Sequence, residues 1–217
     1  MSAFFYVVTA IELFAIITGS YFLKQIKSRF LFLYVFVLIA FITEISKPIL
    51  FYVFDVSQNL WLSHFYFPLE FIFLSLVYLK ELGSSVNKNW MKILIGAFMF
   101  YCIINPLFIQ DFTEYSRVRS FSSIIFLIFS IFYYYQVMAE TKIRKLAGEP
   151  MIWINTAVLI YFAGSLFYTI LFTIILEYSR EFSKLSAYYF NILNLSFYLL
   201  IAVGFWKAGK ENKAVLS

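Results

Sequence analysis

The chain has 217 residues, of which 63% are hydrophobic and 13% are charged, and its mean hydropathy is +0.84. Soluble domains carry roughly 25% charged residues, and a soluble fold could not bury this much apolar surface. A polytopic α-helical membrane protein is therefore expected. The formal net charge of +5 comes from basic loops between apolar segments, and we do not interpret it as nucleic-acid binding.

Seven apolar segments predict an all-α, seven-transmembrane-helix bundle that forms one domain over residues 1–217. Each segment is close to the roughly 20 residues that a bilayer core requires. The loops between them are short, which leaves no room for a soluble catalytic module. The expected helices lie at about residues 3–22, 30–53, 59–79, 90–109, 119–138, 151–175 and 185–206.

The distribution of Lys and Arg predicts the orientation, because cytoplasmic loops carry an excess of both. Four residues, Arg117, Arg119, Arg180 and Lys184, lie in one set of alternate loops, and 12 of the 17 lie in the other set. The N-terminus is therefore expected outside and the C-terminus in the cytoplasm, in a multi-pass protein of the cell (cytoplasmic) membrane. The larger set comprises Lys24, Lys27, Arg29, Lys80, Lys88, Lys92, Lys142, Arg144, Lys145, Lys207, Lys210 and Lys213.

Four ionisable residues fall inside apolar segments: Glu12, Glu44, Lys47 and Glu70. An ionisable group in hydrocarbon costs on the order of 3 kcal/mol, so such groups pair, neutralise or line a wet cavity. At 1.5 Å rise per residue, all four lie in the outer half of the bilayer. Glu44 and Lys47 are three residues apart and are expected to pair. The pattern predicts an outward-facing polar cavity, with structural interhelical pairing as the alternative.

Further polar side chains share helical faces with these residues and complete the expected ligand site. They alternate with aromatic and small residues, which is also typical of ordinary helix packing in membranes. The predicted ligand-binding residues are Glu12, Glu44, Lys47, His64, Tyr66, Glu70, Ser165, Tyr168, Asn191 and Asn194.

The scarcity of His and Cys limits which cofactors, metal ions and disulfides the chain can hold. His64 is the only histidine and Cys102 the only cysteine. One chain therefore cannot supply two axial histidines to a haem or three histidines to zinc, and it cannot form an intrachain disulfide. No cofactor, metal or catalytic residue is assigned.

One stretch of the sequence resembles a recurrent pattern in small bacterial seven-helix membrane proteins of unassigned function. It consists of Asn59-Leu60-Trp61-Leu62, then His64, Tyr66 and Pro68-Leu69-Glu70-Phe71, and the run from Leu199 to Trp206 is similar to the same group. The resemblance implies the seven-helix fold and carries no activity, substrate or site residue.

Four functions compete at this point. The first is non-enzymatic binding or sensing of a small solute or lipid headgroup, and the second is a proton-coupled carrier that uses Glu12 or Glu70. The third is an intramembrane lipid-modifying enzyme, with His64 or Glu70 as general base and Ser165 as nucleophile. The fourth is a structural subunit docked to a membrane-protein partner or to further copies of itself. The lipid bilayer is a partner in all four.

Overall fold

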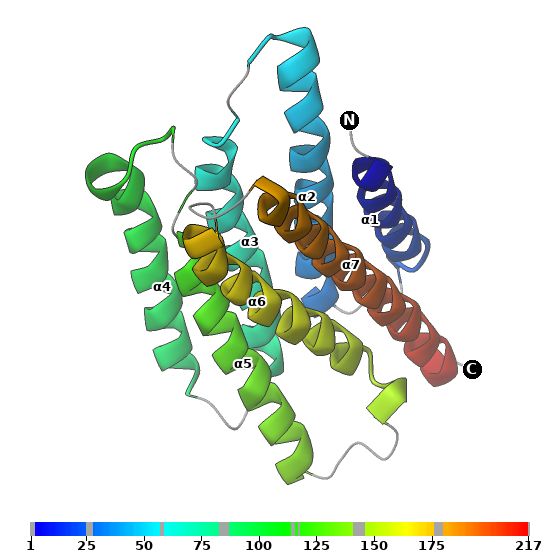
Figure 1. Cartoon of the computed structure of the whole chain (residues 1–217). Coiled ribbons are helices and arrows are strands. Elements are labelled where there is room, and N and C mark those ends of the chain that lie inside the picture. The colour runs from blue at the N-terminus through cyan, green and yellow to red at the C-terminus, as the bar shows by residue number, and fades with distance from the viewer. Residues whose placement is uncertain are drawn as a thin grey trace. The chain divides into compact units, whose positions relative to one another are not determined.

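The structure is a computed structural model of the chain, and it describes residues 3–24, 28–56, 59–82, 87–113, 116, 118–140, 146–175 and 180–216. Helices account for nearly all of this part of the chain (Figure 1). They are α1 (Ala3–Tyr21), α2 (Ser28–Val53), α3 (Leu62–Glu81), α4 (Lys88–Ile104), the π-helix η1 (Asn105–Ile109), α5 (Val118–Glu140), the 3₁₀ turn η2 (Leu146–Gly148), α6 (Pro150–Ile175) and α7 (Arg180–Leu216).

Within the described residues, seven helices are long and apolar enough to cross a membrane. They correspond one to one with the seven predicted segments, which confirms the all-α class and a multi-pass membrane protein.

The predicted boundaries are least accurate for the last helix. α7 runs from Arg180 to Leu216, whereas the prediction covered residues 185–206. Hydropathy marks where a stretch stops being apolar, and a helix can continue into water beyond that point. The apolar window of α7 accordingly ends at Lys210 although the helix does not.

α2 ends in a tight turn. Asp55 adopts a left-handed backbone conformation with φ 55°, which Asp tolerates better than most residues. The amide of Val56 then donates to the carbonyl of Leu50 at 3.0 Å.

The chain divides into two compact units. Unit 1 comprises residues 1–26 and 122–217, and unit 2 comprises residues 27–121. The expectation of one domain over residues 1–217 stays a prediction.

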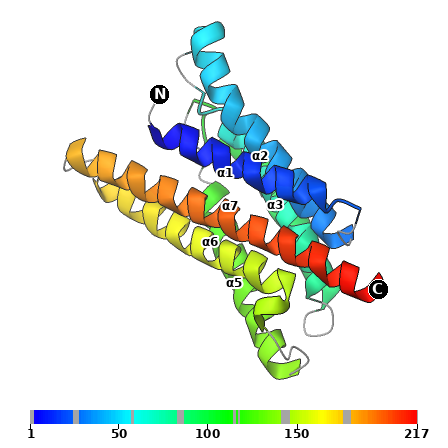
Figure 2. The same ribbon diagram turned by 90° about the vertical axis from the view of Figure 1, so that its right-hand side faces the viewer.

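In unit 1, α7 packs against both α1 and α6 (Figure 2). The ring of Phe4 lies 5.1 Å from that of Tyr188, and Phe22 contacts Gly209. Because both ends of α1 meet the corresponding ends of α7, these two helices run parallel.

α6 and α7 run antiparallel and approach closely at glycines. A Cβ atom on Gly164 would lie 2.6 Å from Cδ1 of Leu193, and one on Gly204 would lie 2.6 Å from Cγ1 of Ile154. Glycine at such a contact lets the side chain of one membrane helix pack directly against the backbone of its neighbour.

α5 joins α6 through polar contacts. Ser130 Oγ donates to the carbonyl of Asn155 at 3.2 Å, and Asn155 Nδ2 donates to the carbonyl of Ser130 at 3.2 Å. The hydroxyls of Tyr134 and Thr156 lie 2.6 Å apart. These bonds act as interhelical attachments in an otherwise apolar interface.

Unit 2 is built around α3, which packs against α2 and α4. The ammonium of Lys80 lies 4.6 Å from the ring centroid of Phe32 in α2. The rings of Phe71 and Phe98 lie 3.9 Å apart between α3 and α4.

Several helical hydroxyls bond to the carbonyl four residues earlier, and thereby hide their polarity from the surroundings. Examples are Thr9 to Phe5 at 2.8 Å and Thr43 to Ile39 at 2.8 Å. The outer faces of the helices are therefore more apolar than their sequences imply, as a hydrocarbon environment requires.

The contact of Gly209 with Phe22 generates a prediction. Gly209→Ala places a Cβ against the edge of the Phe22 ring, closer than van der Waals contact allows, and overpacking of this kind costs about 1–3 kcal/mol. We expect a lower free energy of unfolding in bicelles. The control is Gly96→Ala in α4, where nothing lies within 4 Å of an added Cβ; there the substitution is expected to be neutral or to stabilise by up to about 1 kcal/mol. Equal effects at the two positions would contradict the packing.

Candidate functional site

The ten predicted site residues are divided equally between the two units. Unit 2 holds Glu44, Lys47, His64, Tyr66 and Glu70, and unit 1 holds Glu12, Ser165, Tyr168, Asn191 and Asn194. Each unit is therefore described by itself.

A buried ion pair is the centre of unit 2. Arg119 Nη1 donates to Oε2 of Glu70, and both side chains are 1% exposed. The hydroxyl of Tyr66 donates to Oε1 of Glu70 at 3.4 Å. The guanidinium carbon of Arg119 also lies 5.1 Å from the ring centroid of Phe67. The carboxylate thus has its counter-charge and a hydroxyl donor, which is what a buried charge needs.

Arg119 is a buried charged residue that the sequence analysis did not include in the candidate site. It was counted among the loop cations, but the structure places it in the first turn of α5 (Val118–Glu140) with its side chain fully buried. The available signal was its position at the edge of an apolar segment, in a chain where the buried Glu70 had no assigned partner. Loop charges and buried charges look alike at a segment boundary, so the pairing could not be read from spacing.

Unit 2 contains other buried polar groups. The amide of Ser116 donates to Oγ of Ser63 at 3.2 Å, and Asn105 Nδ2 donates to Oε1 of Gln110 at 3.2 Å. Ser116 is 1% exposed and Asn105 is 0% exposed. Among the described residues, Oδ1 of Asn105 and Oγ of Ser116 have no hydrogen-bond partner. Buried oxygens of this kind are costly and are typical positions for bound water or a ligand group.

Next to this polar region lies a groove between α3 and α4, here called the α3–α4 groove. Its volume is about 410 Å³, within the range of small-molecule sites. His64 lines it, is 6% exposed, and has its ring 5.2 Å from the ring of Phe112. The lining residues are His64, Phe65, Pro68, Leu69, Met99, Cys102, Ile103, Pro106, Leu107 and Phe112.

The wall of the α3–α4 groove on the α4 side is irregular. α4 passes at Asn105 into the π-helix η1, which contains Pro106, and the amide of Gln110 donates to the carbonyl of Asn105 at 2.8 Å. Pro106 and Leu107 of this wide turn line the groove. Short π-helical turns inside helices are frequent at functional sites.

Asp111 follows η1 outside the membrane-spanning segments. Hydrogen bonds from the backbone amide of Thr113 at 2.9 Å and from its hydroxyl at 3.0 Å lower the pKa of Asp111, and the charge of His64 lowers that pKa further. The carboxylate therefore stays ionised at a lower pH than an ordinary Asp. It supplies negative charge near the His64 end of the α3–α4 groove.

The expected pair in α2 is present. Lys47 Nζ donates to Oε2 of Glu44 at 2.6 Å, with the side chains 45% and 25% exposed respectively. The i, i+3 pairing is confirmed. Both side chains are far less buried than the pair formed by Glu70 and Arg119.

The predicted site residues of unit 1 lie on three helices. Glu12 of α1 is 3% exposed and Ser165 of α6 is 1% exposed. The ring of Tyr168 lies 5.0 Å from that of Phe190 in α7. Asn191 and Asn194 are half-buried on α7.

In the described ranges, no group of three His, Cys, Asp or Glu side chains lies close enough to hold a metal ion. Cys102 is buried and is not disulfide-bonded.

Neither a family model, nor a curated protein, nor a solved structure matches the chain.

The ion pair of Glu70 and Arg119 generates a prediction about stability. Glu70→Gln and Arg119→Gln each leave a charge buried without its partner, so each is expected to lower the free energy of unfolding by about 3–5 kcal/mol. The double variant leaves no charge and is expected to lose less than the sum of the two. Denaturant unfolding in detergent micelles, analysed as a double-mutant cycle, measures the coupling.

Glu44→Gln is the control for this cycle. Its partner Lys47 is 45% exposed, and its long side chain can extend toward the membrane surface, so the expected loss is smaller than for either member of the buried pair. Strictly additive losses at Glu70 and Arg119 would show that the two side chains do not interact as described.

Proposed function

We propose that the protein binds an uncharged lipid, with the polar end of that lipid held beside His64 in the α3–α4 groove. The observation that carries this proposal is the composition of the groove wall. It has aliphatic and aromatic side chains along its length and one imidazole, His64.

The absence of charged side chains from the groove lining indicates which class of ligand fits it. None of the ten lining residues of the α3–α4 groove is Lys, Arg, Asp or Glu. An anionic headgroup would lose its water there beside the negative charge of Asp111 and without a Lys or Arg partner in the lining, at a cost of several kcal/mol. An uncharged head, such as the hydroxyl of a diacylglycerol, needs only a hydrogen-bond partner, which an imidazole supplies.

In this proposal the ion pair of Glu70 and Arg119 has a positioning role. It joins α3 to the start of α5, and Tyr66 and Phe67, which contact the pair, belong to the same helix as His64. Because the carboxylate of Glu70 is paired with the guanidinium of Arg119, it is better suited to holding α3 and the start of α5 together than to carrying protons. The proposed role is therefore binding rather than catalysis.

The proposed orientation has the N-terminus outside and the C-terminus in the cytoplasm of a bacterial cell. It is supported by the 12 Lys and Arg residues in one set of alternate loops and by the cytoplasmic excess of such residues in known membrane proteins. His64, in the first turn of α3, then lies toward the outer surface.

A proton-coupled carrier is the second proposal, favoured by Glu12, which is 3% exposed on α1. A buried carboxylate in a membrane helix is a natural proton carrier. Reconstituted vesicles under a pH gradient are expected to acidify faster with the wild-type protein than with Glu12→Gln. Equal rates, with a protonophore as positive control, would end this alternative.

A lipid-modifying reaction through Ser165 and His64 has less support, because helix rise places the two residues at membrane depths that differ by roughly 9–14 Å. The structural-subunit alternative predicts a stoichiometric protein partner or a stable oligomer after gentle solubilisation.

The lipid proposal is tested by filling the groove. Leu107 lines it and is 62% exposed, whereas Ile93 on α4 is 61% exposed and does not line it. We expect Leu107→Trp to lower the diacylglycerol occupancy measured by native mass spectrometry by about tenfold, since the added ring displaces acyl chain contacts. Ile93→Trp is expected to bind as wild type.

His64→Leu tests the polar end of the same ligand. Loss of one hydrogen bond is expected to weaken diacylglycerol binding by about fivefold. If Leu107→Trp and Ile93→Trp retain the same occupancy as wild type, the α3–α4 groove does not bind this lipid.

A further inference from the structure

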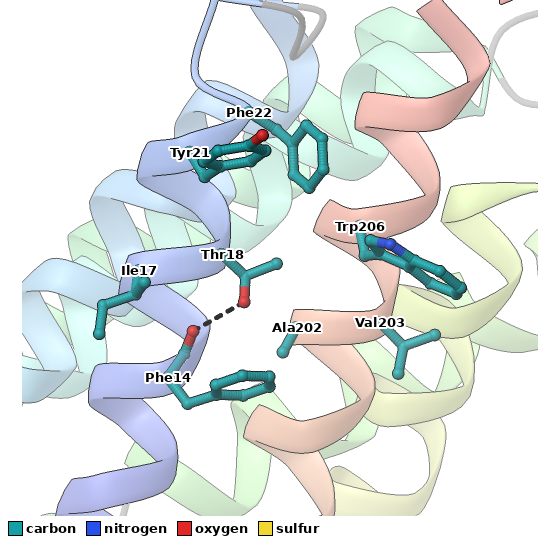
Figure 3. A pocket seen from close by; sticks show the side chains of 8 residues that line it. All are labelled: Phe14, Ile17, Thr18, Tyr21, Phe22, Ala202, Val203 and Trp206. Carbon is teal, nitrogen blue, oxygen red and sulfur yellow. Dashed lines mark hydrogen bonds between the residues drawn. The ribbon is translucent and has the colours of Figure 1, made fainter. Parts of the chain in front are cut away.

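A second groove lies in unit 1 between α1 and α7, here called the α1–α7 groove (Figure 3). Its volume is about 520 Å³. The close view shows side chains of α1 on one side and of α7 on the other. The lining residues are Phe14, Ile17, Thr18, Tyr21, Phe22, Ala202, Val203 and Trp206.

The walls of the α1–α7 groove offer almost no polarity. Thr18 is one of its few polar lining residues, and its hydroxyl donates to the carbonyl of Phe14 at 2.8 Å (Figure 3). Because this hydroxyl is hydrogen-bonded within its own helix, Thr18 contributes mainly its methyl group to the groove wall. The groove is therefore suited to a hydrocarbon chain.

One end of the α1–α7 groove is cationic, in contrast to the α3–α4 groove. The ammonium groups of Lys210 and Lys207 lie 4.0 Å and 5.2 Å from the ring centroid of Trp206. Lys24 follows two residues after Phe22, whose ring contacts Gly209 at the same end of α7. Two lysines thus flank an aromatic ring that is itself part of the groove wall, with a third close to the adjoining end of α1.

We propose that the α1–α7 groove binds an anionic glycerophospholipid, with an acyl chain along its apolar walls and the phosphate against Lys207 and Lys210. The apolar window of α7 ends at Lys210, which is where the headgroup of a lipid beside this helix would lie. A net negative headgroup complements the two lysines, whereas in phosphatidylcholine the quaternary ammonium offsets the charge of the phosphate and leaves no net attraction. This site is independent of the one proposed in unit 2, since it uses other helices and an anionic ligand in place of an uncharged one.

Trp206 provides the readout, because it lines the groove and indole fluorescence is quenched by bromine on an acyl chain in contact. A variant with Trp61, Trp90 and Trp153 replaced by Phe leaves Trp206 as the only tryptophan. This variant is placed in nanodiscs of phosphatidylcholine that contain a small fraction of either brominated phosphatidylglycerol or brominated phosphatidylcholine. Fluorescence is expressed relative to the same variant without brominated lipid.

We expect brominated phosphatidylglycerol to quench Trp206 more than its mole fraction predicts, and brominated phosphatidylcholine to quench in proportion to its mole fraction. Lys207→Gln with Lys210→Gln is expected to weaken the preference by about fivefold for each lysine removed. The matched control is Lys88→Gln with Lys92→Gln, exposed lysines of α4, which should leave the preference unchanged.

A second pair of variants tests occupation of the groove itself. Thr18→Phe fills it and is expected to reduce quenching by brominated phosphatidylglycerol to the mole-fraction value. Thr9→Phe, at a half-buried threonine of the same helix outside the groove, should not reduce quenching.

Three results would overturn the proposal. They are equal quenching by the two brominated lipids, an equal loss of preference in the Lys88 and Lys92 control, and unchanged quenching in Thr18→Phe. The second result would indicate general surface charge rather than a site, and the third would indicate a lipid that stays outside the groove.

Discussion

In a membrane-spanning chain, each polar group removed from water must find its partner within the protein, because hydrocarbon supplies none. The pair of Glu70 and Arg119 is the most demanding case, since it places two full charges at 1% exposure. Satisfying it requires the start of α5 to lie against the middle of α3. The position of the polar residues around Ser63 and Ser116, which bond to each other, follows from the same constraint.

The same constraint explains the character of the remaining surface. Threonines that bond to their own helix, such as Thr18, present only methyl groups outward. Glycines at helix crossings, such as Gly164 and Gly204, let α6 and α7 approach closely. The described grooves consequently have apolar walls, with few polar groups at their ends: an imidazole in one and lysines beside the other.

Hydropathy alone was sufficient to predict the seven helices, because the length and apolarity of a membrane span are properties of a local segment. The pairing of Glu44 with Lys47 was equally local, since helix geometry determines which side chains three residues apart meet. The partner of Glu70 lies 49 residues away, and neither periodicity nor spacing carries that information. The grooves were not predictable either, because they depend on side-chain shapes from two helices at once.

The π-helix at Asn105–Ile109 is equivalent to an α-helix into which one residue has been inserted. Each residue of an α-helix turns the chain by about 100°. A deletion of one residue in this stretch would allow a regular helix to form, and would rotate the following segment, including Phe112, by that angle. The ring of Phe112, now 5.2 Å from His64, would then face elsewhere. The number of residues in this π-helix therefore matters more than which residues they are. Natural variants of the chain are expected to differ here by substitution, and not by insertion or deletion.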